Sequence, residues 1–147
     1  MADVQYDNFQ ERLDLYSSRD LTHKLGELVS KSKDGLTTFG DLWYAFFPDV
    51  KWKHHTSRYL IKKTLGRVGE YCSINNYPLL NVMVVSAKNR KHPDRAVGNI
   101  FAAAKEWRLE TGLNADAFVN LQMAKCKGID WEKLPDDKVS TDTEKNA

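Results

Sequence analysis

The sequence predicts a mainly helical domain with a small β element. One reason is the segment 56–75, in which apolar and basic side chains separate onto opposite sides of a helix. A second is the apolar, β-branched run "PLLNVMVV" at 78–85, which is the part of the chain most typical of a strand. A third is the length of 147 residues, which is that of one domain and can bury a core without disulfides or metals.

Two helices are expected before residue 36. Ser17 or Ser18 is placed to cap the second helix, and Gly35 to end it in the left-handed conformation. Apolar residues recur at helical spacing in both segments, so each helix is expected to bury one face. The expected buried faces are Phe9, Leu13 and Tyr16 in the first helix and Leu21, Leu25, Leu28 and Val29 in the second.

The segment "TTFGDLWYAFFPD", residues 37–49, predicts a short third helix. Thr38 and Asp41 form an acidic capping box at its start, and Pro48 closes it. We expect most of the aromatic residues here to lie in the core and a minority to stack on bases. The aromatic residues of this region are Phe39, Trp43, Tyr44, Phe46, Phe47 and Trp52.

The helix expected over residues 56–75 is cationic on the side that does not face the core. At 100° per residue its apolar side chains fall in an arc of about 140°. The helix has no acid before Glu70 that could pair with its bases at i,i+4 spacing, so it differs from the usual solvated helix. The apolar arc is Leu60, Ile61, Thr64, Leu65, Val68, Tyr71 and Cys72, and the basic face is Arg58, Lys62, Lys63 and Arg67.

The run at residues 79–85 is apolar on both faces, so we expect a strand that is covered on both sides. A strand needs a partner, and residues 50–52 are one candidate. After the basic loop 87–95, two more helices are expected, one from Asp94 as its cap to Gly112 and one from the cap Asn114 to about Lys127. Their expected inward residues are Val97, Ile100, Phe101, Ala104 and Trp107, and then Phe118 and Leu121.

Charge is segregated along the chain. The net charge is only +2, but residues 21–129 hold seventeen bases and nine acids, whereas residues 1–20 and 130–147 are acidic. A basic body with acidic ends indicates attraction to nucleic acid or to an acidic protein. The sequence shows no secretory signal and no run of 18 apolar residues, so we expect a cytoplasmic protein that does not contact membranes. We expect one globular domain over residues 1–131 and an acidic disordered tail at 132–147.

Residues 36–92 resemble the winged helix-turn-helix domain of alkylguanine-DNA alkyltransferases and alkyltransferase-like proteins. "TTFGDL" at 37–42 is similar to that family's T-x-[YF]-G-[DE]-[ILV] segment. "TSRYLIKKTLGRVGEY" would take the place of its recognition helix, and "LLNVMVV" that of the strand bearing P-C-H-R-V-V. The sequence departs from the family at the reactive site, where it has Leu80, Asn81, Val82 and Met83. The resemblance therefore implies a DNA-binding shape without alkyl transfer, because the acceptor cysteine and its activating histidine are missing.

The sequence contains no P-loop, GxGxxG, GxSxG, HExxH or paired-carboxylate motif. Cys72 lies on the apolar arc and is expected to be a buried thiol, whereas Cys126, between two lysines, is expected at the surface. His54 and His55 are adjacent, so they lack the i,i+3 or i,i+4 spacing of metal ligands on one helix. We therefore expect neither a metal nor a cofactor.

The leading hypothesis is a non-catalytic protein that binds DNA or RNA through phosphate contacts. Such contacts set affinity without reading sequence, and base readout would need Ser57, Arg58 or Asn81 in a groove. One alternative is a phage- or plasmid-encoded protein-binding module that inhibits or regulates a nuclease or defence protein, and another is a nuclease with an unrecognised site. The predicted nucleic-acid contacts are Lys51, Lys53, His54, Ser57, Arg58, Lys62, Lys63 and Arg67, with Lys88, Arg90, Lys91 and Arg95 from the loop.

Overall fold

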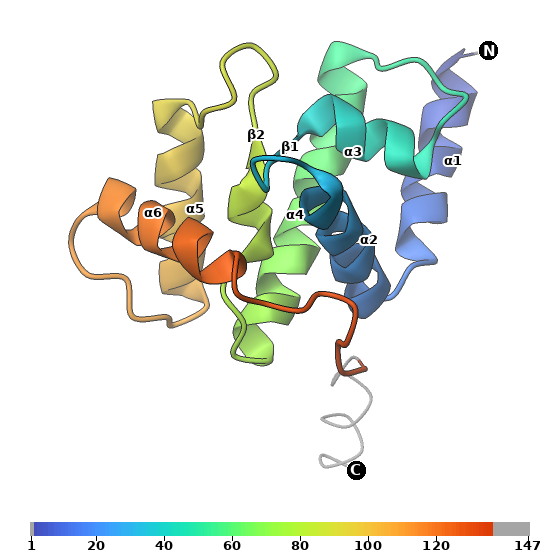
Figure 1. The fold of residues 1–147 in the computed structure, drawn as a ribbon. Helices are drawn as coiled ribbons and strands as arrows, with labels where there is room; N and C mark the ends of the chain where they lie inside the picture. The colour runs from blue at the N-terminus through green and yellow to red at the C-terminus, as the bar shows by residue number, and fades with distance from the viewer. Residues whose placement is uncertain (1, 137–147) are drawn as a thin grey trace.

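A computed structural model describes residues 2–136, and six α-helices of this part of the chain enclose a short 3₁₀ helix and a two-stranded sheet (Figure 1). The predicted fold class, mainly helical with a small β element, is confirmed at this level. In chain order the elements are α1 (Ala2–Asp14), α2 (Ser18–Lys31), β1 (Thr37–Thr38), α3 (Phe39–Phe46), α4 (His54–Ile74), the 3₁₀ helix η1 (Leu80–Met83), β2 (Val84–Val85), α5 (Asp94–Glu106) and α6 (Ala115–Cys126).

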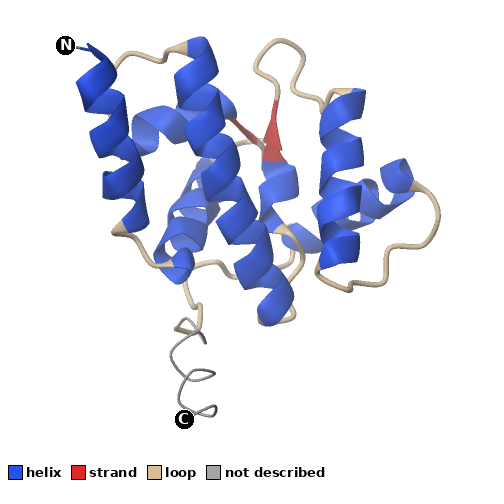
Figure 2. Cartoon of the chain, turned by 180° about the vertical axis from the view of Figure 1, so that it is seen from behind, coloured by secondary structure: helices blue, strands red, loops and turns tan. Residues whose placement is uncertain are grey.

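The helix α4 is the central element of the core. It begins at His54, two residues before the predicted start, and all seven residues of the predicted apolar arc are buried. Its neighbours are α1, α2, α3 and η1. Figure 2 shows α4 running the length of the near face, with α5 beside it and β2 set further back between them. The two-faced periodicity of α4 therefore places its apolar side under three helices and leaves part of its basic side toward α5.

The predicted strand at 79–85 is buried as expected but is mostly not extended. Residues 80–83 form η1, and only Val84 and Val85 form a strand. That strand pairs in parallel with β1, with Thr37 opposite Val84, so the expected partner at residues 50–52 is wrong. The 3₁₀ turn has a physical reason, since η1 contacts α2, α4 and α6 together. A turn with three residues per revolution directs successive apolar side chains to three neighbours, whereas a strand would serve only two faces.

Several predicted helix ends are confirmed by their caps. The Ser17 hydroxyl accepts a hydrogen bond from the Asp20 amide at 3.0 Å, and Thr38 does the same for the Asp41 amide at 3.1 Å. The Asn114 side chain caps α6 by accepting from the Ala117 amide at 2.9 Å. These contacts satisfy amide groups that a helix leaves unpaired in its first turn.

Other predicted ends and faces differ from the structure. Gly35 has the expected positive φ of 74°, but α2 already ends at Lys31 and Gly35 belongs to the following turn. The helix α5 begins at Asp94 after Pro93 and ends at Glu106, well before Gly112. In α6, Leu121 is exposed rather than inward, although Phe118 is buried. The helix α5 ends earlier than predicted because Arg108, two residues after its last residue, adopts a positive φ of 63°.

The segment 129–135, which we name the C-terminal strap, packs across α2 and α4. Trp131 and Leu134 are buried, the Tyr71 hydroxyl donates to the Pro135 carbonyl, and Arg19 Nε donates to the Leu134 carbonyl at 3.2 Å. The packed chain thus extends beyond the boundary expected at residue 131. Most of the predicted tail, residues 137–147, lies outside the described residues.

Candidate anion-binding cleft between α4 and α5

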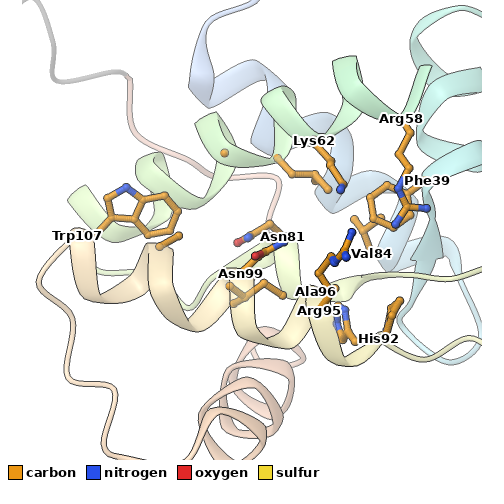
Figure 3. A pocket seen from close by; sticks show the side chains of 15 residues that line it. Phe39, Arg58, Lys62, Asn81, Val84, His92, Arg95, Ala96, Asn99 and Trp107 are labelled. Carbon is orange, nitrogen blue, oxygen red and sulfur yellow. The ribbon is translucent and has the colours of Figure 1, made fainter. Parts of the chain in front are cut away.

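A cleft of about 490 Å³ lies between α4 and α5, with η1 and β2 beneath it (Figure 3). Most of its lining is apolar, including Leu65 from α4, Val84 from β2, and Ile100 and Ala103 from α5. Trp107, just after α5, stands at one end of the cleft, and Phe39 stands at the other. The cleft is thus an elongated apolar trough with an aromatic ring at each end.

Two glycines of α4 shape this cleft. A Cβ on Gly69 would lie 2.5 Å from Cη2 of Trp107, so only glycine lets that indole lie directly against the helix backbone. A Cβ on Gly66, one turn earlier, would meet nothing within 4 Å. The first glycine therefore closes the cleft at its Trp107 end, and the second keeps the middle of the cleft open.

Three basic residues line the cleft, and no acidic residue does so among the described part of the chain. Arg58 and Lys62 come from α4 and Arg95 from the first turn of α5. The guanidinium carbon of Arg58 lies 4.9 Å from the centre of the Phe39 ring, a cation–π contact that holds Arg58 at that end. Three cations without a neutralising carboxylate create a positive potential that attracts anions.

Two polar side chains lie on the floor. His92 Nε2 is 2.6 Å from the Val82 carbonyl oxygen, and because a carbonyl only accepts, this nitrogen carries the proton. Burial lowers the pKa of His92, so the ring is neutral near pH 7. Asn81 Oδ1 is buried without a hydrogen-bond partner among the described residues, and it lies on the side of Gly69.

The structure brings many of the predicted contact residues to one end of the molecule. Figure 1 shows the start of α4, the loop between β2 and α5, and the start of α5 at the same end of the molecule. The C-terminal strap lies at the opposite end. Arg58, Lys62 and Arg95 line the cleft itself. Around them lie exposed basic residues of the two connecting loops and of α4, namely Lys51, Lys53, His54, Lys63, Lys88 and Lys91.

In three of the predicted contact residues, the polar side-chain atoms make hydrogen bonds within the chain. Ser57 is fully buried, and its hydroxyl accepts from the Lys53 amide at 2.8 Å. Arg67 donates to two carbonyl oxygens at and just after the end of α1, at 3.3 and 2.7 Å. Arg90 makes two hydrogen bonds to the Asp34 carboxylate, at 2.8 and 2.7 Å. These hydrogen bonds stabilise the fold and hold the three side chains against the chain itself.

Both cysteines are buried free thiols. This confirms the expectation for Cys72, whose pKa burial raises to about 12. It corrects the expectation of a surface thiol at Cys126, where Sγ donates to the Leu79 carbonyl at 3.6 Å and burial raises the pKa. A thiol that stays protonated at neutral pH is a poor nucleophile.

The cleft is the feature that the sequence analysis missed. Trp107 was expected to face the core, yet it forms one end of the cleft, and the part that Gly66 and Gly69 play was not foreseen. A usable signal was present in the sequence, since two glycines one turn apart follow Lys62 on the same side of α4. Such a pair leaves a helix backbone accessible to a neighbouring ring or ligand.

Comparisons with protein-family models, with curated proteins and with solved structures find no match to this chain. Within residues 2–136 no helix combines the length and the apolarity that crossing a bilayer requires. The same residues bring together no group of three or more His, Cys, Asp or Glu side chains suited to a metal ion.

Proposed function

We propose that this protein binds nucleic acid without catalysing a reaction, and that it holds phosphate groups at the mouth of the α4–α5 cleft. The observation that carries the proposal is the meeting of Arg58 and Lys62 with Arg95, which is more than thirty residues away in sequence, in a cleft lined by no described acid. Guanidinium and ammonium groups bind phosphate by charge-assisted hydrogen bonds.

The surroundings of the cleft support a long ligand with repeated charges. The exposed Lys88 and Lys91 lie in the loop before α5, and the exposed His54 lies in the first turn of α4. Both segments lie at the end of the molecule at which α4 and α5 begin (Figure 1), and Arg58 and Arg95 belong to the first two turns of these helices. A strand lying over the cleft would therefore pass further cations on each side, which is how non-specific phosphate contacts accumulate affinity.

We also propose that the nucleic-acid-binding part is a winged helix-turn-helix. The helix pair would be α3 and α4, joined by residues 47–53, and the wing would be the loop at 86–91. This loop is closed by hydrogen bonds between Ser86 and both Arg90 and Lys91. Its preceding strand pairs in parallel with β1, whereas a usual wing is an antiparallel hairpin, so the wing here would be a compact loop.

The test is binding of fluorescently labelled duplex DNA, single-stranded DNA and RNA, followed by anisotropy at 50 and 200 mM salt. Six or more phosphate contacts predict that affinity falls by roughly 10³-fold between these concentrations. The variant Lys62→Glu/Arg95→Glu reverses two exposed cleft charges and should weaken binding by at least about tenfold while lowering the slope of log affinity against log salt by about 2.

The matched control is Lys125→Glu/Lys133→Glu, which makes the same change in net charge at exposed positions outside the cleft. It should bind within a few-fold of wild type. Equal binding by both double variants would refute the cleft as the phosphate site. No binding by wild type at 50 mM salt would refute the function and favour a protein partner, whose apolar side chains would suit the trough. Cleavage of the labelled strands in the presence of magnesium would instead show a nuclease.

A further inference from the structure

Phosphate contacts leave most of the α4–α5 cleft unexplained. The three cations lie toward its Phe39 end, and the trough continues past them along Leu65 and Ile100 to Trp107 (Figure 3). Phosphate groups gain nothing from this apolar surface. A cleft of about 490 Å³ with an apolar lining and a few polar groups has the size and character of a small-molecule site.

Besides its three cations, His92 and Asn99, the cleft holds Asn81, which has an unpaired buried side-chain atom. Its Oδ1 is buried near Gly69, where a Cβ would come within 3.1 Å of it, and it accepts no hydrogen bond from the described residues. Leaving a buried acceptor unpaired destabilises the folded state unless a ligand or another group supplies a donor. Because Oδ1 lies on the Gly69 side, the amide nitrogen lies on the other side of the carboxamide, where it can donate to an anion in the cleft.

We propose that the α4–α5 cleft is a binding site for a small aromatic anion. Arg58, Lys62 and Arg95 would hold the anionic group, and the ring would lie in the trough toward Trp107. The same three cations serve the phosphates in the proposed function, so the aromatic anion and nucleic acid would exclude one another. This exclusion rests on the proposed function, whereas binding of the anion does not.

The first experiment uses naphthalene-1-acetate as the probe, titrated into the full chain by calorimetry without nucleic acid. Acetate carries the charge without the ring, and naphthalene-1-acetamide carries the ring without the charge. We expect both to bind at least tenfold more weakly than the probe. In two-dimensional nitrogen–proton NMR spectra the side-chain signals of Asn81 and Trp107 should shift with the probe. Equal binding of probe and acetamide, or shifts confined to other residues, would overturn the proposal.

The second experiment fills the cleft with a larger side chain. Gly66→Leu places a side chain in the open middle of the cleft, and Gly98→Leu makes the same change on α5 at a residue that does not line the cleft. A Cβ meets nothing within 4 Å at either glycine, so both variants should fold, which far-ultraviolet circular dichroism checks. We expect Gly66→Leu to lose at least tenfold in affinity for the probe and Gly98→Leu to match wild type. The same affinity in both variants would place the probe elsewhere and overturn the site.

Competition separates the two proposals. Adding naphthalene-1-acetate to the nucleic-acid complex should release the labelled strand from wild type. The probe concentration that releases half of the strand should be at least tenfold higher for Gly66→Leu. Probe binding without competition would refute the shared cations but leave the aromatic-anion site standing. Probe binding by a protein that binds no nucleic acid would refute the proposed function alone. Competition by acetate alone at the same ionic strength would show that the ring contributes nothing, and would overturn the aromatic site.

Discussion

The replacement of Gly26 by alanine tests how the C-terminal strap is held. Gly26 is buried in α2, and a Cβ there would lie 2.3 Å from Cβ and 2.9 Å from Cγ of Trp131. Both distances are far shorter than a van der Waals contact between carbon atoms. The strap must therefore shift, because the nearest atoms belong to the root of the Trp131 side chain, which cannot rotate away.

The expected loss in the free energy of unfolding of Gly26→Ala lies between two limits. Overpacking that the strap absorbs by a small shift costs about 1–3 kcal/mol. Complete release would expose Trp131 and Leu134, and loss of a buried tryptophan alone costs about 3–5 kcal/mol. Alanine returns about 0.5–1 kcal/mol through its better helix propensity. We therefore expect Gly26→Ala to be destabilised by roughly 1–3 kcal/mol.

Urea unfolding followed by circular dichroism measures this change. The control is Gly98→Ala on α5, where a Cβ meets nothing within 4 Å, and which should gain about 0.5–1 kcal/mol. Partial proteolysis should also cut the strap faster in Gly26→Ala than in the control, because a shifted strap opens locally more often. If Gly26→Ala were as stable as wild type or gained stability like Gly98→Ala, the packing of Trp131 on α2 would be wrong.

Two further predictions concern titrating groups. Arg90, with hydrogen bonds from Ser32 and Leu36, holds the pKa of Asp34 well below its usual value. Wild type should thus unfold at a higher urea concentration than Asp34→Asn. This difference in urea midpoint should have its full size above about pH 4, near the pKa of Asp34 in the unfolded chain, and should shrink as the pH falls below that value. High salt should reduce this difference because the pair is partly exposed. Cys72→Ser and Cys126→Ser should retain nucleic-acid binding, and in the folded wild type both thiols should react with Ellman's reagent at pH 8 only as fast as the chain unfolds, since burial raises their pKa values. Fast reaction of either thiol without unfolding would contradict the buried positions.

Local patterns predicted most of the helices. The apolar arc of α4 follows from helical periodicity alone, and the caps at Ser17, Thr38 and Asn114 follow from side-chain oxygens that reach amides three residues away. The burial of residues 79–85 followed from their composition. Their conformation did not, because three surrounding helices favour a 3₁₀ turn and β1, more than forty residues earlier, supplies the strand partner.

The amino-acid sequence by itself determined that α4 has a basic side and that residues 87–95 are basic. Only the tertiary structure decided which of these charges meet. It turned Arg90 toward Asp34 and Arg67 toward the end of α1, and it placed Arg95 across a cleft from Lys62. A helical period fixes the direction of a side chain relative to its own axis, but its partner depends on the elements that pack alongside, and that packing is set by contacts between residues far apart in the chain.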